Sequence, residues 1–512
     1  MSWISQKWGM RPILYPVPGV ERDVATILQI TSTPVRVDIY THTGWAKING
    51  VDGYLSMSGA VKEKSVDHGI TVQLPTELQG YSLPDPKNTT TEDIFASLSL
   101  LKIGPKSVLW PTWLATYRAP LGPSDFALFV AGRTGTFKSE LASLLQSHYG
   151  AGMTARKLPA SWNSTANALE ALCYRTKDAL IAIDDYVPVG TGYQLRALAA
   201  KVDQVIRAQG NQSGRTRLTD TSSIQGTMFP RGIILGTGED VPEGHSIRGR
   251  MIVTELSPGD IPVKLLTAAQ ANRPHYPLAM AAWIRYIATN GLRDQIKEAA
   301  DTYRDTMLGI GHSRTPSILG DLLATAEFLN RWLTDEKHLT NAQANDFHAK
   351  ATDALQEAGQ NQKQYLTTAD PIEIFKSVVR MILATQRGHL KTRNGGVPES
   401  ADQVGWLTTQ GHGEQPQYKA CGPCIGWLDP ERQELLLDPN ALAYIKKQSD
   451  GRLSVTDATF AKRLKDANLL VRTDAARQRN SIRMTIEGHP RNVLAMSASE
   501  VLDDSGATDT NV

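Results

Sequence analysis

The stretch AGRTGTFKSE, residues 131–140, follows the apolar run DFALFVA and begins the amphipathic segment SELASLLQSHYG. A Walker A loop has the pattern G-x-x-x-x-G-K-[ST] between a strand and a helix. Gly132 begins this pattern and Lys138–Ser139 end it, but Phe137 occupies the position of the second glycine. The flanking segments have the composition of a buried strand and a helix, so the context fits a phosphate-binding loop.

Such a loop binds phosphate through backbone N–H groups at a helix N-terminus. Lysine adds a positive charge, and Ser139 offers a hydroxyl ligand for Mg²⁺. Phe137 excludes backbone conformations that only glycine reaches cheaply, while two other glycines still supply the tight turn. A chance match in a strand–helix turn is the alternative. The predicted ATP-binding residues are Gly132, Thr134, Gly135, Thr136, Phe137, Lys138 and Ser139.

A second motif, KDALIAIDDYVP at 177–188, is an apolar strand that ends in two carboxylates. This Walker B form predicts that Asp184 orients Mg²⁺ and that Asp185 polarises the attacking water. Asp184 lies 46 residues after Lys138, a normal spacing within one such domain. A solvated turn at a strand edge is the alternative, and the two motifs together favour ATP binding.

A third strand, RGIILGTGED, ends in Thr237 and is followed by Glu239. In an AAA+ arrangement it lies between the two Walker strands, where Thr237 holds the lytic water; an ordinary strand-end threonine is equally compatible. Next, HSIRGRMIVTEL carries Arg248 and Arg250. We expect one of them, Arg250 before Arg248, to reach the γ-phosphate of a neighbouring subunit. Solvated charges are the alternative.

From 126 to 260, short apolar runs alternate with helical segments, which predicts an α/β protein with a mainly parallel sheet. Alternation over residues 20–85 predicts strands, and 261–365 has helical periodicity. We expect a β-rich module (1–90), an ATPase core (91–260), a helical lid region (261–365), a helical linker with a DNA-binding unit (366–500) and a disordered tail (501–512).

Composition places few restrictions on function. The 512 residues are 41% hydrophobic and 21% charged with a net charge of +2, so any nucleic-acid surface must be local. Three cysteines fit a reducing compartment. No signal peptide and no apolar run of membrane-spanning length is present, which predicts a cytoplasmic protein without membrane contact.

The motifs together resemble a known family. AGRTGTFKSELASLLQSHYG, LPASWNSTANALEAL, KDALIAIDDYVP, PRGIILGTGEDVP and SIRGRM are similar to AAA+ ATPases of bacterial integrative elements and phage satellites, the domain-of-unknown-function family 927. That family is related to superfamily 3 and MCM-type helicases and accepts a bulky residue before the loop lysine. The resemblance covers most of the chain. It implies an AAA+ core, a C-terminal winged helix, a homo-hexameric ring and DNA translocation, with any primase or initiator on another chain.

Two further predictions follow from the resemblance. Arg314, at the start of a helix, fits a sensor 2 arginine that reaches phosphate from the lid; a solvated arginine is the alternative. In VIRAQGNQSGRTRLTD, two glycines bracket a polar loop near Arg207, Arg215 and Arg217. These arginines would grip DNA phosphates in a channel hairpin, or complete the neighbour's ATP site, or remain solvated.

The C-terminal region is locally basic. Residues 441–491 hold eleven Lys/Arg and five Asp/Glu. A short helix with Lys462, Arg463 and Lys465, followed by a two-stranded wing, predicts DNA contacts; protein contacts are the alternative. Arg472, Arg477, Arg479 and Arg483 belong to the wing.

The pair Cys421 and Cys424 has the spacing of half a zinc site, with only His412 near in sequence. A structural zinc site needs four ligands, so two ordinary thiols are the favoured interpretation. The sequence as a whole predicts an ATP- and Mg²⁺-dependent DNA helicase of a mobile genetic element. An ATP-switched DNA-binding initiator or regulator that never unwinds DNA is the main alternative, and a scaffold ring with an inactive site is a third.

Overall fold

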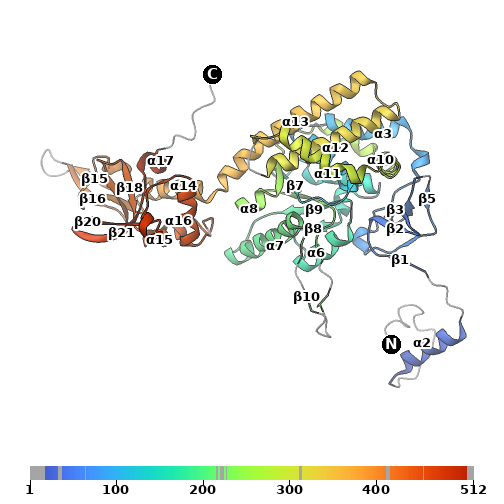
Figure 1. Ribbon diagram of the computed structural model, residues 1–512, viewed down its shortest axis with the longest axis horizontal. Coiled ribbons are helices and arrows are strands. Elements are labelled where there is room, and N and C mark those ends of the chain that lie inside the picture. Colours follow the sequence, from blue (N-terminus) through green and yellow to red (C-terminus); the bar gives the residue numbers. More distant parts are fainter. Residues whose placement is uncertain are drawn as a thin grey trace.

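The computed structural model describes residues 18–32, 37–63, 65–214, 217–218, 224–225, 228–310, 314–410, 416–453 and 455–503. Figure 1 shows a large central body, a smaller β-rich part at one end of it, and a C-terminal lobe at the other end. None of the helices in the described part is long and apolar enough to cross a membrane.

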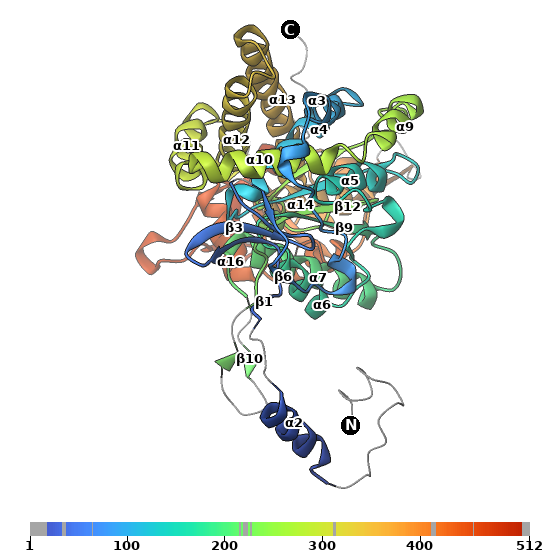
Figure 2. The ribbon, with the colours of Figure 1, turned by 90° about the vertical axis from the view of Figure 1, so that its right-hand side faces the viewer.

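The N-terminal part begins with a helix where alternating strands were expected. In VERDVATILQIT the apolar residues recur with helical spacing, and the segment forms α2, which stands apart from the body in both ribbon views (Figures 1 and 2). The following strands pair as the antiparallel order β2-β3-β4-β5, with β1 and β6 in a separate parallel pair. The elements are α2 (Val20–Thr31), β1 (Ile39–Tyr40), β2 (Gly44–Ile48), β3 (Val51–Ser56), β4 (Gly59–Val61), β5 (Val66–Asp67) and β6 (Thr71–Val72).

The central body is built on a five-stranded parallel sheet in the order β13-β7-β12-β9-β8. The predicted strands of both Walker motifs are present, and β12 lies between them as expected. Burial on both faces explains their continuous apolar runs. The elements are α3 (Thr91–Ser99), α4 (Lys106–Arg118), β7 (Ala127–Ala131), α5 (Lys138–Gln146), β8 (Ala160–Ser161), α6 (Ala166–Arg175), β9 (Leu180–Tyr186), α7 (Gly192–Asn211), β10 (Arg217–Leu218), β11 (Ile224–Gln225), β12 (Ile233–Gly238), α8 (His245–Arg248) and β13 (Met251–Glu255).

Five helices follow the sheet, in agreement with the predicted helical region. One continuous hydrophobic cluster joins them to the sheet and to β2–β4, from Trp45 to Leu355. Arg118 of α4 and Asp321 of α12 form a buried ion pair at 2.5 Å. The helices are α9 (Val263–Ala271), α10 (Tyr276–Asn290), α11 (Leu292–Thr306), α12 (Thr315–Asp335) and α13 (Asn341–Thr368).

The C-terminal lobe has its own core, which runs from Phe375 to Val501. It contains more strand than the expected helical linker, because CIGWLD and ELLL pair as β17 and β18. Val501, expected in a disordered tail, is buried in α17, and residues 504–512 lie outside the described part. The elements are α14 (Pro371–Ala384), β14 (His389–Thr392), β15 (Trp406–Gln410), β16 (Pro416–Ala420), β17 (Cys424–Asp429), β18 (Glu434–Leu437), α15 (Ala441–Gln448), α16 (Asp457–Asp466), β19 (Leu470–Arg472), β20 (Ile482–Ile486), β21 (His489–Ser497) and α17 (Ala498–Leu502).

Candidate nucleotide site

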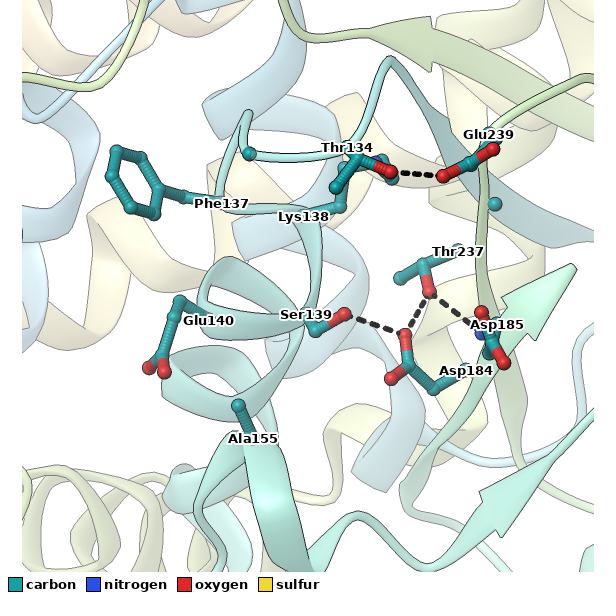
Figure 3. Close-up of a pocket in the computed structure, with 12 residues that line it drawn as sticks. Thr134, Phe137, Lys138, Ser139, Glu140, Ala155, Asp184, Asp185, Thr237 and Glu239 are labelled. Carbon is teal, nitrogen blue, oxygen red and sulfur yellow. Dashed lines mark hydrogen bonds between the residues drawn. The ribbon is translucent and has the colours of Figure 1, made fainter. Parts of the chain in front are cut away.

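A cavity of about 320 Å³ opens at the carboxyl edge of the parallel sheet, where β7, β9 and β12 end. Its lining brings together the loop after β7 and the polar ends of β9 and β12 (Figure 3). The residues that line it are Thr134, Gly135, Phe137, Lys138, Ser139, Glu140, Ala155, Asp184, Asp185, Thr237, Gly238 and Glu239. Motifs more than 90 residues apart in the chain therefore form one site.

The loop between β7 and α5 has the geometry of a phosphate-binding turn. Gly132 needs the absence of a side chain, because a Cβ there would lie 2.3 Å from the carbonyl oxygen of Leu256. Thr136 is buried and its hydroxyl donates to the Arg133 carbonyl at 2.9 Å. Neither Gly132 nor Thr136 lines the cavity, so the two residues contribute to the conformation of the loop and not to the cavity surface.

Phe137 occupies the left-handed backbone region, with φ 65° and ψ 22°. The expectation that its side chain excludes conformations favoured by glycine is therefore wrong: Phe137 adopts one of them. A left-handed residue that is not glycine costs about 1–2 kcal/mol. The ring is partly buried against the hydrophobic core and points away from Lys138 and the carboxylates in Figure 3, which leaves the backbone N–H groups of the loop accessible.

Lys138 begins α5 and lies on the floor of the cavity. Its ammonium donates to the carbonyl of Arg133 at 2.8 Å. Burial lowers the pKa of Lys138, while the negative charges of Glu239, Asp184 and Asp185 act in the opposite direction. The three acids outnumber the lysine, so a divalent cation bound beside them would favour binding of an anion at Lys138.

Asp184 is the centre of a hydroxyl network. Its Oδ1 accepts from Ser139 Oγ at 2.8 Å and also from Thr237 Oγ1. Carboxylate and hydroxyl oxygens are the ligands that Mg²⁺ prefers, so this donor set fits the ion. The Thr237 hydroxyl in turn accepts from the backbone N–H of Asp185 at 3.4 Å. Thr237 thus connects the two acids. The sequence predicted only a contact of Thr237 with the lytic water.

Asp185 also has a partner that the sequence interpretation missed. Asn163 Nδ2 donates to Asp185 Oδ2 at 3.2 Å, from the segment directly after β8. Asp185 itself is exposed and has a left-handed φ of 68°. Asn163 follows the carboxyl end of β8, the strand next to β9. Polar residues at this place are candidates for the site, but the two-residue strand β8 was not predicted, so Asn163 was not identified. Glu239 was noted only for its position, and it accepts from the Thr134 hydroxyl.

The predicted arginines do not line this cavity. Arg250 directly precedes β13 and therefore lies at the amino edge of the sheet, opposite the loop. Burial lowers the pKa of Arg250, and the nearby charges of Arg314 and Arg207 lower it further. Arg314 is the N-cap residue of α12 and is exposed, while Arg207 is helical and pairs with Asp203 at 2.6 Å. The structure therefore gathers these three arginines at one edge.

Arg248 has a different environment from Arg250. Its guanidinium donates to the carbonyl of Tyr365 at 2.8 Å and to the Thr368 hydroxyl at 3.0 Å, both on α13. It also donates to the Pro242 carbonyl at 2.9 Å. Arg248 thus attaches α8 to the end of α13.

The expected hairpin after α7 is present as the antiparallel pair β10–β11. The polar loop begins later than expected, because Gly210 still belongs to α7. Arg215 lies outside the described residues, and the structure gives Arg217 in β10 without describing its side chain.

In the C-terminal lobe, α16 carries Lys462, Arg463 and Lys465 on its exposed surface. Arg477 and Arg479 are exposed in the turn between β19 and β20. Arg472 instead pairs with Glu434 of β18. β20 and β21 form an antiparallel pair directly after this turn.

Cys421 and Cys424 are free thiols, and burial raises the pKa of Cys424. The described residues contain no group of three or more histidine, cysteine, aspartate or glutamate side chains arranged to hold a metal, and His412 lies outside them.

Comparison with known proteins supports a helicase-like fold. The chain is similar to the structure of SCCmec type IV Cch, described as an active helicase, with a TM-score of 0.57 and 14% identity over 94% of this chain and 84% of that one. The C-terminal region of NrS-1, in an apo form, matches with a TM-score of 0.25 and 10% identity over 67% of this chain and 82% of that one. No family model matches the chain, and no curated protein matches its sequence. The chain is thus a mixed α/β protein with a parallel sheet and a fold shared with a helicase.

Proposed function

We propose that this chain is an ATP- and Mg²⁺-dependent AAA+ DNA helicase that works as a homo-hexameric ring in the replication of a mobile genetic element. One observation carries the proposal. The strand order β13-β7-β12-β9-β8 brings Lys138, Ser139, Asp184 and Asp185 to a single cavity, in a chain that shares its fold with a protein described as an active helicase.

The side chains of the cavity have separate roles in binding and hydrolysing ATP. Lys138 binds the β- and γ-phosphates through its charge, and the backbone N–H groups of the loop bind the same oxygens. Ser139 and Asp184 would hold Mg²⁺, which would supply positive charge against the phosphates. Asp185 accepts the proton of the attacking water, and Asn163 fixes the orientation of its carboxylate.

The arginines of the amino edge serve the neighbouring subunit. Arg250 and Arg314 are too far from their own loop to act there, because the strands between the two edges are parallel and run from one edge to the other. A contact that joins one edge of a subunit to the opposite edge of the next is head-to-tail, and such contacts form a ring when the rotation between subunits closes. Both guanidiniums bond within their own subunit, Arg248 to α13 and Arg250 to α7 and α8; we assign Arg250, which lies near Arg314 and Arg207, as the residue that neutralises charge in the transition state.

DNA would contact two surfaces. Arg207, Arg215 and Arg217 belong to the end of α7 and to the β10–β11 hairpin, which we assign to single-stranded DNA in the ring channel. Helix α16 and the β19–β21 strands form the proposed winged helix, where duplex phosphates would meet Lys462, Arg463, Lys465, Arg477 and Arg479.

We further assign the chain to the mobile-element ATPases of the domain-of-unknown-function family 927, in the cytoplasm, with any primase or initiator as a separate partner. In this assignment residues 1–90 are an accessory module, 91–260 the AAA+ core, 261–365 the lid region and 366–500 the linker and winged helix. Support comes from the motifs quoted above and from the helices α9–α13.

Unwinding of a forked DNA duplex by the purified chain tests the proposal. We expect strand separation that requires ATP and Mg²⁺ and is absent in Lys138→Ala, which lacks the charge that binds phosphate. Hydrolysis and ATP-dependent DNA binding without strand separation would favour an initiator or regulator. Absence of hydrolysis would contradict both functions.

A further inference from the structure

Gly210 is an unusual residue at its place in the chain. It is buried one position before the end of α7, inside the helix, where glycine is the least favourable residue apart from proline. A Cβ at this position would lie 2.5 Å from Cδ of Arg250 and 2.9 Å from its Cγ and Nε. The side chain of Arg250 therefore crosses α7 where only glycine leaves room.

The next residue of α7 contacts the guanidinium of Arg250 directly. Asn211 Oδ1 accepts from Arg250 Nη2 at 3.1 Å. On the other side, Ser246 accepts from Arg250 Nη1 through its carbonyl at 2.7 Å and its hydroxyl at 2.6 Å. The guanidinium is thus held between α7 and α8 in one orientation.

The end of α7 is fixed relative to the sheet. Gln209 Nε2 donates to the Ser124 carbonyl at 2.7 Å and to the Gly232 carbonyl at 2.8 Å, and these residues precede β7 and β12. Val205 and Ile206 of the same half are buried, whereas residues 191–197 at the other end of α7 are exposed. The turn that contacts Arg250 is therefore the anchored part of this helix.

We propose that Gly210 and Asn211, together the Arg250-binding turn, position Arg250 for the nucleotide of the neighbouring subunit. Gly210 supplies the space for the side chain and Asn211 supplies the acceptor that aims the guanidinium. Both are positioning residues, because neither reaches the nucleotide. The inference rests on the proposed role of Arg250 and assigns a function to a helix end that the motifs did not identify.

Steady-state ATPase of the full chain with the variants Gly210→Ala and Asn211→Ala tests this inference. Gly210→Ala should lower kcat about tenfold or more with little change in KM for ATP, because the methyl group displaces Arg250. Asn211→Ala should lower kcat about tenfold, the equivalent in rate of one hydrogen bond to a charged group. Asn211→Gln keeps an uncharged amide acceptor and should retain more turnover than Asn211→Ala.

Matched controls separate positioning from folding. Gly192→Ala places a methyl group at the other end of the same helix, where the nearest atom is Arg196 Nη2 at 3.7 Å, and it should leave turnover unchanged. The melting temperature of Gly210→Ala should stay within about 4 °C of the wild type, because alanine favours the helix. Lys138→Ala subunits, which have an intact Arg250, should restore turnover to Gly210→Ala in mixtures.

The outcomes distinguish a failure of the positioning role of Gly210 and Asn211 from a failure of the proposed function. If Arg250→Ala is inactive while Gly210→Ala and Asn211→Ala turn over at the wild-type rate, the positioning role is wrong and the proposed function stands. A Gly210→Ala defect that Lys138→Ala subunits fail to restore would place the fault in the subunit's own pocket and also overturn the inference. A fully active Arg250→Ala would remove the arginine from the proposed function itself.

Discussion

The two edges of the central sheet carry opposite chemistry. At the carboxyl edge, Lys138 faces Asp184, Asp185 and Glu239, and the hydroxyls of Ser139 and Thr237 are directed at Asp184. At the amino edge, Arg250 lies near Arg314 and Arg207. The first edge is suited to phosphate with a divalent cation, and the second to negative charge without one. Arginine predominates at the amino edge, although Asp203 and Asp125 also lie near Arg250, and lysine and acids lie at the carboxyl edge, a division expected if one subunit completes the site of the next.

Of the substitutions considered, replacement of Arg250 should reduce the rate of ATP turnover most. Arginines that act in trans contribute about 10³–10⁵ in rate. Arg250→Ala should therefore lose turnover by about this factor and retain ATP binding, because the charge is needed in the transition state. Stopped ATPase with preserved nucleotide binding, measured by fluorescence of a labelled ATP analogue, is the expected result.

A mixture of inactive subunits sharpens the same test. Arg250→Ala has an intact pocket and Lys138→Ala an intact arginine, so interfaces between them contain one complete site. We expect part of the ATPase to return on mixing. Co-assembled subunits without recovered activity would contradict the shared site.

Asp185→Asn tests the carboxyl edge alone and should have the next largest effect. The amide cannot accept the proton of the attacking water, a contribution of about 10²–10⁴ in rate. ATP binding should be preserved, since Lys138 and the loop remain. Asn163→Ala serves as the comparison, because it loses only the 3.2 Å hydrogen bond and should have a smaller effect on kcat. Equal turnover of Asp185→Asn and wild type would exclude Asp185 as the base.

The basic surface of the C-terminal lobe should be separable from both edges. The double variant Lys462→Ala/Lys465→Ala removes two exposed charges of α16, and each lost phosphate contact lowers the log–log salt slope of duplex binding by about 0.9. Basal ATPase should not change. Point variants are preferable to removal of residues 441 onward, because that deletion removes β21 from its pairing with β18. An unchanged slope would show that α16 does not contact DNA.

The carboxyl edge was largely predictable because its signals are local. DFALFVA is a short apolar run followed by the residues that we assign to phosphate, and ALIAIDD is one that ends in the acids that we assign to Mg²⁺ and to the attacking water; parallel strands bring such ends together. The amino edge was not predictable in the same way. Arg250 and Arg314 were selected one by one, and only the fold places them beside each other. Gly210 was assigned to a loop, because nothing local shows that a distant side chain crosses the helix there.

Two errors have a different physical origin. Helix α2 was interpreted as strand because it is rich in the β-branched residues Val, Ile and Thr, although Val20, Val24, Ile27 and Leu28 share one helical face. The strands of the C-terminal lobe were missed for two reasons: β15 and β16 are mostly exposed and lack an alternating pattern, whereas β17 and β18 are short buried apolar runs, which periodicity alone does not separate from helix. Helix α2 and the strands β15 and β16 bury few side chains, so their sequences carry little of the periodic pattern that burial on one face produces.

Among the substitutions at the carboxyl edge, Phe137→Gly should have a much smaller effect on turnover than Asp185→Asn. The loop binds phosphate through backbone N–H groups, which glycine keeps, and the ring points away from the acids in Figure 3. Turnover should remain within about tenfold of wild type, a difference in barrier of about 1.4 kcal/mol. This outcome would show that the carboxyl edge depends on the backbone shape at this position and not on the side chain.

Comparison of two variants at this position isolates the cost of the left-handed backbone. Phe137→Ala and Phe137→Gly both lose the packing of the ring, but only alanine retains the strain at φ 65°. The glycine variant should therefore be the more stable of the two by about 1 kcal/mol, measured as the difference in thermal unfolding. If the two variants unfold alike, the left-handed conformation is not a source of strain at residue 137. If turnover of the glycine variant collapses while its melting temperature is preserved, the ring itself contacts the nucleotide, and the side chain, as well as the backbone, would then belong to the site.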